Sequence, residues 1–477
     1  MTDKFEMLPG STLRKARQKI AIAFAVIVFS TSHAVSAESQ TPQSKSAGNS
    51  NCRVESIDYK GWKAQQVSNR WVQLTFVPQN GGRLMQVTFN GHDYLFVNPK
   101  LAGQITPPNE NQWVNYGGDK IWLLPEGDDD EQHWRGGSDL IDAGEFSFRK
   151  LSDQKGCGLE LTGPPDPHSG VQISRTVRLE PDSPHIAFLA TMKNISGHTL
   201  EWSMQSVSQY DTGNGDQSRR NPDIWGFTQA NPSSGYLNRY HVRDGPVGNP
   251  SASIREDGLF AVHYSHVAAE FWIDSPNGWL AVVDGSSRYA MVERFQYEER
   301  KTYPGKASVI FWTNGSHLRF NDEGEASVTD GNNGPAPFYM EAELNSPICR
   351  LRPDESCQLE TDWYPTRAAA EFHGTTDAGI ITTPLRAQAL ENGKVKLSGS
   401  FGVFFAGKLV AHLYNDHGSN IANVPVANVT PTELVVLDQE ISSPGKPARV
   451  SLHLEDQSGL DRGAFQEIPI QTGKRVE

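Results

Sequence analysis

The chain has 477 residues, with 56 acidic and 43 basic side chains, so its formal net charge is −13. A negative field repels nucleic-acid phosphates and anionic membrane surfaces, which excludes both as main partners. The sequence contains no GxSxG and no phosphate-loop motif, so nucleotide chemistry is not expected.

The first predicted element is an export signal. A basic stretch from Arg14 to Lys19 precedes ten apolar residues, 20–29, and a run of small residues ends at Ala37. Ten apolar residues are too few to cross a bilayer as a helix, and the order is typical of a secretory signal peptide; the alternative is a buried helix. We therefore expect removal of 1–37, which leaves an exported, periplasmic or extracellular protein with a net charge of −16.

Strand-like alternation recurs through the rest of the chain. Runs such as WVQLTFVP, HIAFLATMKN and GWLAVVDG are separated by Gly, Pro, Asn and Asp turn signals. We predict an all-β fold, with a disordered linker over 38–54 and a main domain over 55–370. A composition change from Pro365 to Thr383 predicts a boundary before an immunoglobulin-like β sandwich over 380–477. No transmembrane segment is expected, because no later apolar run is long enough.

Four cysteines follow the signal, in a compartment where disulfides persist. Cys349 and Cys357 end a short Pro-containing turn between strand-like runs, close enough to bridge, and we favour that pair. The remaining Cys52 and Cys157 then tie the start of the domain to an inner strand; the alternative is four free thiols. No CxxC or Cys/His spacing indicates zinc, so neither a metal nor another cofactor is expected.

Five segments carry a resemblance to a known family. They are GGRLMQVTFNG, WVNYGGDKIWLLPEG, PPDPHSGVQISRTVRL, EWSMQSVSQY and YMEAELNSPICRLRPDES, which begin at Gly81, Trp113, Pro164, Glu201 and Tyr339. From about Asp58 to Arg367 the chain resembles the galactose-mutarotase-like β-supersandwich proteins, and most closely the DUF4380 family of bacterial proteins. The resemblance implies a sheet-on-sheet fold with a concave face that holds a sugar in relatives. It implies no reaction, because this fold hosts several activities.

Glu341 is the catalytic base that the resemblance implies. Mutarotases use a Glu in an LET-like motif on a strand near the end of the domain, and the matching stretch here is Met340-Glu341-Ala342. Side chains alternate along a strand, so Glu343 points to the same face, where a second carboxylate raises the proton affinity of one of the two. The alternative is a pair of solvent-facing glutamates on an edge strand.

The acid that protonates the ring oxygen must differ from that of mutarotases, because this chain lacks their histidines. Those enzymes carry His-Gly-Gly where this chain has Tyr116 followed by two glycines. Tyr116, Asp119 and Lys120 are the candidate stand-ins, since the glycines allow the backbone to approach a ligand closely. The alternative for Asp119 and Lys120 is a turn with a salt bridge.

Further polar and aromatic residues are predicted to bind the substrate. Gln205 and Gln209 lie where mutarotases carry a second His, and Asn115 precedes the glycine pair. Arg83 is a candidate donor to a sugar hydroxyl or carboxylate. Trp122 is either a stacking platform for a pyranose face or a core residue.

The sequence predicts an exported carbohydrate-interacting protein with a mutarotase-like cleft and an accessory β sandwich. In the enzymatic hypothesis, Glu341 acts as base in proton transfer on a sugar, as in an aldose 1-epimerase-like isomerase. In the second hypothesis, the protein is a non-catalytic glycan-binding or envelope-assembly protein that kept the cleft. A third is a polysaccharide lyase, since Tyr and Lys can remove the proton next to a uronate carboxylate.

Overall fold

A computed structural model describes residues 52–109, 113–127, 133–134, 136–137, 139–246, 248–320, 326–328 and 337–472. The predicted signal peptide lies outside these residues, as does most of the predicted linker. The end of that linker is a correction, because Cys52 is joined to Cys157 and strand β1 (Arg53–Tyr59) begins directly after it. None of the described helices is long and apolar enough to span a membrane.

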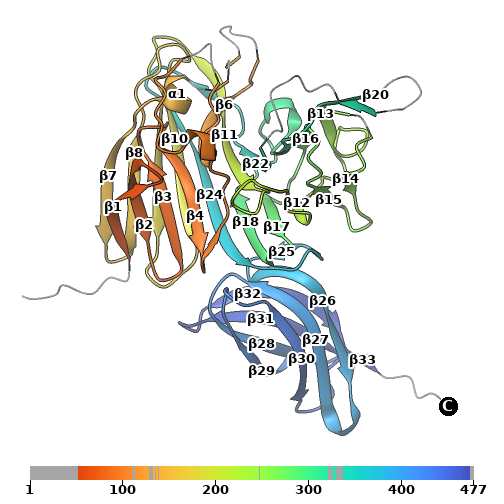
Figure 1. The fold of residues 1–477 in the computed structure, drawn as a ribbon. Coiled ribbons are helices and arrows are strands. Elements are labelled where there is room, and N and C mark those ends of the chain that lie inside the picture. Colours follow the sequence, from red (N-terminus) through yellow and green to blue (C-terminus); the bar gives the residue numbers. More distant parts are fainter. Residues whose placement is uncertain are drawn as a thin grey trace, which may run out of the picture. The chain divides into compact units, whose positions relative to one another are not determined.

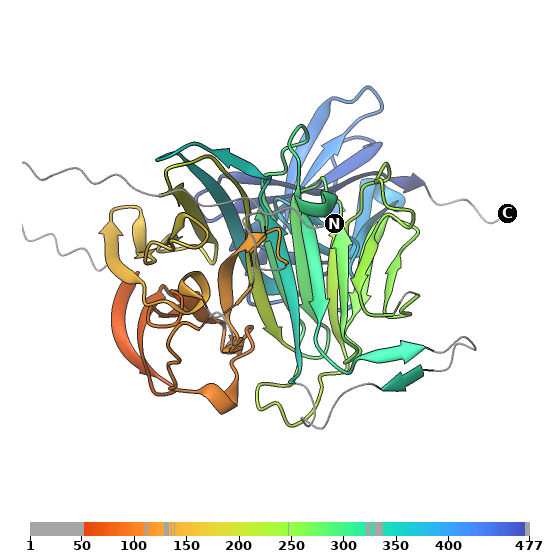
Figure 2. The same ribbon diagram turned by 90° about the horizontal axis from the view of Figure 1, so that it is seen from above.

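The first large sheet carries the residues of the candidate site (Figure 1). In spatial order it comprises β1, β2 (Trp62–Ser68), β3 (Val72–Val77), β4 (Arg83–Phe89), β6 (Asp119–Leu124), β11 (Leu200–Asp211), β22 (Tyr339–Asn345), β19 (Val309–Thr313), β16 (Ala269–Ile273) and β13 (His241–Asp244), with β5 (His92–Asp93) on β4 and β23 (Cys349–Leu351) on β11. Seen from above, the red and orange strands lie at one end and the green strands at the other (Figure 2).

The second large sheet faces the first. In spatial order it comprises β14 (Ala252–Ile254), β15 (Leu259–His263), β12 (Ile224–Gln229), β17 (Trp279–Asp284), β18 (Tyr289–Phe295), β24 (Ser356–Arg367), β10 (Ile186–Asn194), β9 (Val171–Leu179), β8 (Gly156–Thr162) and β7 (Ser147–Asp153). Helix is confined to short pieces in the described ranges, namely α1 (Leu140–Ala143) and three 3₁₀ turns at Pro99–Leu101, Pro304–Lys306 and Glu391–Gly393. A small hairpin joins β20 (Leu318–Phe320) to β21 (Ala326–Val328).

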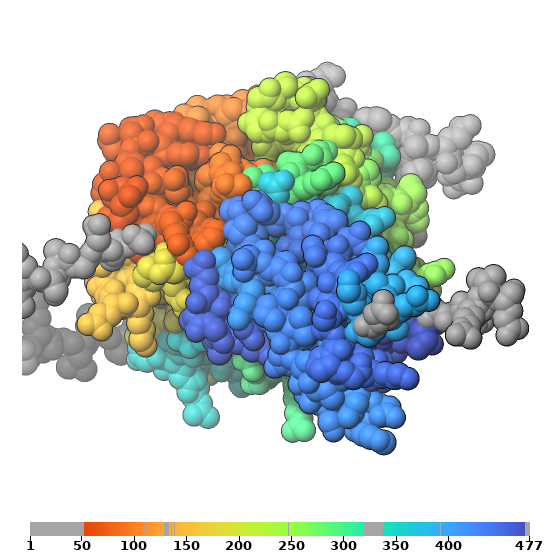
Figure 3. Space-filling model, turned by 90° about the horizontal axis from the view of Figure 1, so that it is seen from below, coloured from red at the N-terminus to blue at the C-terminus, as the bar shows by residue number. Residues whose placement is uncertain are grey.

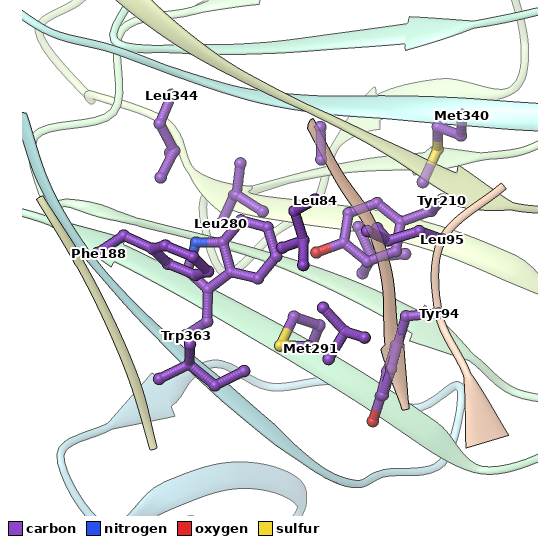
Figure 4. Packing of buried hydrophobic residues seen from close by; sticks show 14 of the residues in the cluster. Leu84, Tyr94, Leu95, Phe188, Tyr210, Leu280, Met291, Met340, Leu344 and Trp363 are labelled. Atoms are coloured by element: carbon purple, nitrogen blue, oxygen red, sulfur yellow. The ribbon is translucent and has the colours of Figure 1, made fainter. Parts of the chain in front are cut away.

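A hydrophobic core fills the space between the two large sheets. Met340 and Leu344 of the first sheet belong to one buried cluster with Leu280, Met291 and Trp363 of the second (Figure 4). The apolar residues of each strand alternate with residues of the opposite face, so one face of each sheet is removed from water. This two-layer packing is what the alternation in the sequence predicts.

The C-terminal sandwich consists of two smaller sheets. One contains β25 (Thr375–Thr376), β26 (Gly379–Ala389), β27 (Lys394–Val403), β30 (Val435–Ser442) and β33 (Gln471–Thr472); the other contains β29 (Asn420–Val429), β28 (Gly407–Tyr414), β31 (Arg449–Asp456) and β32 (Asp461–Pro469). Its strands pair antiparallel, except for β26 with β33.

The core of the C-terminal sandwich continues into the larger part of the chain. Phe227 stacks on Phe372 at 4.6 Å between ring centroids, and the same buried cluster includes Leu397 and Phe465. Figure 3 shows the blue surface of this sandwich from below. The shared cluster buries apolar area from both parts, so each part stabilises the other.

The predicted all-β architecture and both predicted cysteine pairs are confirmed. Cys52 pairs with Cys157 and Cys349 with Cys357, with Cα–Cα distances of 5.6 and 6.5 Å. The first disulfide links the start of β1 to β8, and the second links β23 to β24.

Candidate functional site

A cleft of about 1040 Å³ opens on the face of the first sheet that is turned away from the core. Its walls combine acidic and aromatic side chains. They include Glu126, Glu270, Glu341 and Glu343 together with Trp113, Trp122, Trp272 and Trp312. Arg243, Gln205, Tyr339 and two histidines, His133 and His317, complete much of the polar lining.

Strand alternation brings two of the glutamates into the cleft. Met340, Ala342 and Leu344 of β22 face the core, so Glu341 and Glu343 face the opposite side. β22 lies between β11 and β19 in the interior of the sheet. The alternative of two solvent-facing glutamates on an edge strand is therefore wrong, and both residues are largely buried, at 7% and 5% exposure.

Glu341 is held by two neighbours from the preceding strands of the sheet. Gln209 Nε2 donates to Glu341 Oε1 at 2.5 Å, and Lys120 Nζ lies 3.6 Å from the same oxygen. Burial lowers the pKa of Lys120, and the negative charge of Glu341 opposes that shift. The pair therefore places a cation and an anion together at the floor of the cleft.

Glu343 is the next residue of β22 on the same face, two positions after Glu341, and it has different neighbours. Gln205 Nε2 donates to Glu343 Oε2, and no cation contacts this carboxyl group among the described residues. Burial, followed by the charge of Glu341, raises the pKa of Glu343 well above its usual range. The two carboxyl groups of one strand thus have different neighbours, a cation and an amide at Glu341 and an amide alone at Glu343.

Trp122 lies in the cleft wall beside the Lys120–Glu341 pair. The Lys120 ammonium is 4.3 Å from the centroid of the indole ring, and Trp122 Nε1 donates to Asp142 Oδ1 at 2.8 Å. Trp134 packs against the ring at 5.4 Å between centroids. Trp122 is therefore both part of a buried cluster and a lining residue, which reconciles the two expectations for it.

Asp119 does not face the cleft. It is adjacent to Lys120 on β6 and therefore points to the opposite face, where it forms a buried ion pair with Arg175 of β9. The hydroxyl groups of Ser206 and Ser208 donate to its Oδ2 at 3.2 Å. The predicted catalytic role for Asp119 has no geometric basis, because its carboxylate is satisfied between the sheets.

Tyr116 and Asn115 also take structural positions. Tyr116 is buried, and its hydroxyl donates to Thr106 Oγ1 at 2.7 Å. Asn115 Oδ1 accepts from Gly117 N at 3.0 Å, which shapes the turn. Gly117, at φ +88°, approaches the Phe96 carbonyl so closely that a Cβ would lie 2.1 Å from it. The glycine pair therefore serves close backbone packing here, and Tyr116 is not an acid in the cleft.

Arg83 is likewise absent from the cleft. Its guanidinium is buried, with Nη2 2.7 Å from Asp142 Oδ1 and Nη1 donating to the Gly117 carbonyl at 3.0 Å. Asp142 accepts from both Arg83 and Trp122, so the two predicted binding residues are linked through α1. Arg83 therefore stabilises the contact between β4 and α1.

Several lining residues escaped the sequence prediction. Glu270 accepts from Trp272 Nε1 at 2.5 Å on β16, and the Arg243 guanidinium lies 5.1 Å from the Trp272 ring. Burial raises the pKa of Glu270. Desolvation and the charges of Glu270 and Glu341 raise the pKa of Glu126 to about 7. Glu126 keeps contact with solvent at the rim of the cleft. β16 and β19 each carry a phenylalanine on the core side and a tryptophan on the cleft side. An aromatic residue on both faces of a strand is the one local signal that the outer face is also covered.

Comparison with solved structures gives distant similarities. A galactose mutarotase-like protein from Clostridium acetobutylicum is 11% identical over 67% of this chain and 100% of its own, with a TM-score of 0.43. A putative mutarotase, YeaD, from Salmonella typhimurium is 11% identical over 66% of this chain and 94% of its own, with a TM-score of 0.42. A putative aldose 1-epimerase from Escherichia coli K12 is 12% identical over 66% and 99%, with a TM-score of 0.35.

No family model and no curated protein matches the chain. The resemblance to DUF4380 therefore stays a prediction from the five sequence segments. Structural similarity at this level indicates no activity for this chain. The residues of the cleft are the basis for its function.

Proposed function

We propose that the protein binds a carbohydrate in this cleft and transfers protons on it, in the manner of a sugar epimerase. The observation that carries the proposal is a pair of buried carboxyl groups on one strand, Glu341 and Glu343, set among tryptophans in one cleft. A sugar presents hydroxyl groups at its edges and C–H groups on its faces. Carboxylates and amides match the hydroxyl groups, and indole rings match the faces.

The two glutamates suit acid–base chemistry on an anomeric centre. Glu341, as carboxylate, accepts the proton of the anomeric hydroxyl group while the bond from the anomeric carbon to the ring oxygen breaks. Glu343, whose pKa is raised by burial, donates its own proton to the ring oxygen. Rotation about the adjacent carbon–carbon bond then turns the other face of the carbonyl group toward the ring hydroxyl. Ring closure by the reverse proton transfers gives the other anomer and returns both carboxyl groups to their starting protonation states.

Lys120 has a positioning role in this scheme, rather than the role of acid. Its ammonium is 3% exposed and lies 3.6 Å from Glu341 Oε1, so it provides the counter-charge of a buried carboxylate. Gln209 fixes the orientation of the same carboxylate. The acid expected among Tyr116, Asp119 and Lys120 is thus replaced by Glu343, with Glu126 as a second titratable group near neutral pH.

A non-catalytic glycan-binding protein is the second candidate. It is favoured by the absence of the mutarotase histidines at Tyr116 and at Gln205 to Gln209, because an imidazole exchanges its proton near neutral pH and a phenol or an amide ordinarily does not. A lyase is less well supported. A uronate carboxylate needs a cation beside the proton-transfer groups. There Lys120 is already paired with Glu341, and the lining arginine, Arg243, lies at the Trp272 end of the cleft.

Export from the cytoplasm is part of the proposal. Two disulfides join all four cysteines, and such bonds persist in oxidising compartments outside the cytoplasm. The sequence order over 1–37, a basic stretch and then a short apolar run, supports the same conclusion.

The test is a thermal-shift screen of the mature protein against soluble mono- and oligosaccharides, because a ligand that binds the native state raises its stability. For each hit, exchange between α and β anomers is measured by NMR magnetisation transfer. We expect Glu341→Gln to abolish the catalysed exchange and to keep binding within about tenfold, since the shape is preserved. Glu360→Gln, at an exposed position on β24, is the matched control.

The outcomes separate the two candidates. Catalysed exchange that depends on Glu341 supports the epimerase. Binding without exchange in the wild-type protein supports the non-catalytic binder. A screen in which no saccharide stabilises the protein overturns both.

A further inference from the structure

Aromatic side chains stand at two opposite ends of the cleft. Trp122 on β6 marks one end, and Trp113, which is 54% exposed, lines the cleft from the segment that leads into β6. Trp312 on β19 and Trp272 on β16 mark the other. At this second end Trp272 is fixed by its hydrogen bond to Glu270.

The two ends are too far apart for one sugar ring. The strand order from β6 to β16 is β6-β11-β22-β19-β16, so four inter-strand steps separate Trp122 from Trp272. At about 4.8 Å per step, the separation is about 19 Å along the sheet. A six-membered ring with bonds of about 1.5 Å spans only about 3 Å between opposite atoms. A single pyranose centred over β22 therefore does not span the strands of both ends.

The carboxyl pair lies midway between these ends. β22, which carries Glu341 and Glu343, is the third of the five strands, two steps from β6 and two steps from β16. The register confirms the alignment, because Glu343 pairs with Val207 and Ile310, which in turn pair with Lys120 and Trp272. The proton-transfer groups thus face the middle of a long site.

We propose that the cleft binds a chain of at least three sugar rings laid across the strands, with an inner ring over Glu341 and Glu343. One outer ring contacts Trp113 and Trp122, and the other contacts Trp272 and Trp312. The cleft volume of about 1040 Å³ agrees with an extended ligand, since it equals the upper end of the range for small-molecule pockets, about 300–1000 Å³. This inference rests on the proposed carbohydrate function and adds the length and placement of the ligand.

The test uses homologous series of malto-, cello-, xylo- and chito-oligosaccharides with one to six rings, and isothermal titration calorimetry for each length. In the series that binds, we expect affinity to rise at least tenfold between one ring and four and then to level off. Trp272→Ala and Trp113→Ala each remove one end of the site. Each should reduce the ratio of tetrasaccharide to monosaccharide affinity at least fivefold.

Phe148→Ala is the matched control, because Phe148 is an aromatic residue with 43% exposure on β7, outside the cleft. It should leave the whole length dependence unchanged. Thermal unfolding of each variant verifies that the fold is retained.

The results distinguish this inference from the proposal on which it rests. The extended site is overturned if a monosaccharide binds as tightly as the longer oligosaccharides, or if neither tryptophan variant changes the length dependence. Either result leaves a monosaccharide function intact. Absence of binding in every series and at every length overturns both. A length dependence that disappears in the tryptophan variants, and not in Phe148→Ala, supports the extended site.

Discussion

The ammonium of Lys120 lies 3.6 Å from the carboxylate of Glu341, although one whole strand, β11, separates β6 from β22 in the sheet. The two side chains meet over β11, next to Gln209, and both are buried. Among the described residues, Lys120 Nζ has no hydrogen-bond partner, so the ion pair is its main polar interaction. A buried charge without its counter-charge is costly, which makes this pair testable.

Lys120→Met should destabilise the protein by about 2–4 kcal/mol, because it leaves the Glu341 carboxylate without a cation in a buried place. The double variant Lys120→Met/Glu341→Gln removes both charges and should recover most of that loss. Urea denaturation of the wild type, both single variants and the double variant gives the coupling free energy. Additive effects of the two substitutions would contradict a mutual dependence.

Stability should fall as pH rises between about 4.5 and 8, in part because of Glu293. This side chain is fully buried in the core, where it accepts from the Tyr210 hydroxyl at 2.5 Å. Burial raises the pKa of Glu293 to about 8, whereas the pKa in the unfolded chain is about 4.3. Between these values the native state binds the additional proton, so ionisation costs stability as pH rises and the cost levels off above about 8.

Glu293→Gln mimics the protonated form and still accepts from Tyr210. The variant should match the wild type near pH 4, below the pKa of the unfolded chain, and exceed its unfolding free energy near pH 8 by about 1–4 kcal/mol. Urea titrations at a series of pH values measure this, and Glu360→Gln serves as the exposed control. An equal gain at both pH values would indicate a packing effect without a titration.

Strand alternation was enough to predict part of the site. It placed Glu341 and Glu343 on one face, and Trp122 and Gln205 line the same cleft. The error at Asp119 has a simple cause: Asp119 and Lys120 are adjacent on β6 and must point to opposite faces, and the sequence alone did not indicate which face was the core.

The other half of the site depends on sheet order. Glu270, Trp272 and Trp312 come from β16 and β19, which follow β6 by about 150 to 190 residues and reach the cleft only because β22 pairs with both β11 and β19. No local pattern encodes such a pairing. Arg83 was misassigned for a related reason, since its partner Asp142 lies on a helix of only four residues that has no amphipathic period.

The two disulfides should contribute unequally to stability. They close loops with sequence separations of 105 residues for Cys52–Cys157 and 8 residues for Cys349–Cys357. By the chain-entropy relation, the longer loop contributes about 5 kcal/mol and the shorter about 2.5 kcal/mol. Paired Cys→Ala variants, compared by urea denaturation under oxidising conditions, measure the two values. A larger loss for the short loop would contradict the entropic account.

The charge of the cleft should discriminate between neutral and acidic sugars. Glu126, Glu270, Glu341 and Glu343 line it, against one exposed lining arginine, Arg243. Glu343 carries its proton in the proposed scheme, so the like charge that a ligand carboxylate meets comes from Glu341 and, where they are ionised, from Glu126 and Glu270. The space is partly desolvated, and opposite charge is provided only at one end. We therefore expect an oligouronate to bind at least about tenfold more weakly than a neutral oligosaccharide of equal length, which is about 1.4 kcal/mol.

Oligogalacturonate and its methyl ester form the matched pair for this test, because they share rings and linkage and differ in charge. Titration calorimetry at low ionic strength should show the ester binding more tightly, and added salt should narrow the difference by screening. Glu270→Gln should narrow it as well, since that change removes one carboxylate beside Trp272. If neither form binds, the comparison moves to neutral and carboxylated members of the series that does bind. Tighter binding of the free acid would contradict the electrostatic argument and would favour a lyase that recognises uronates over an epimerase of neutral sugars.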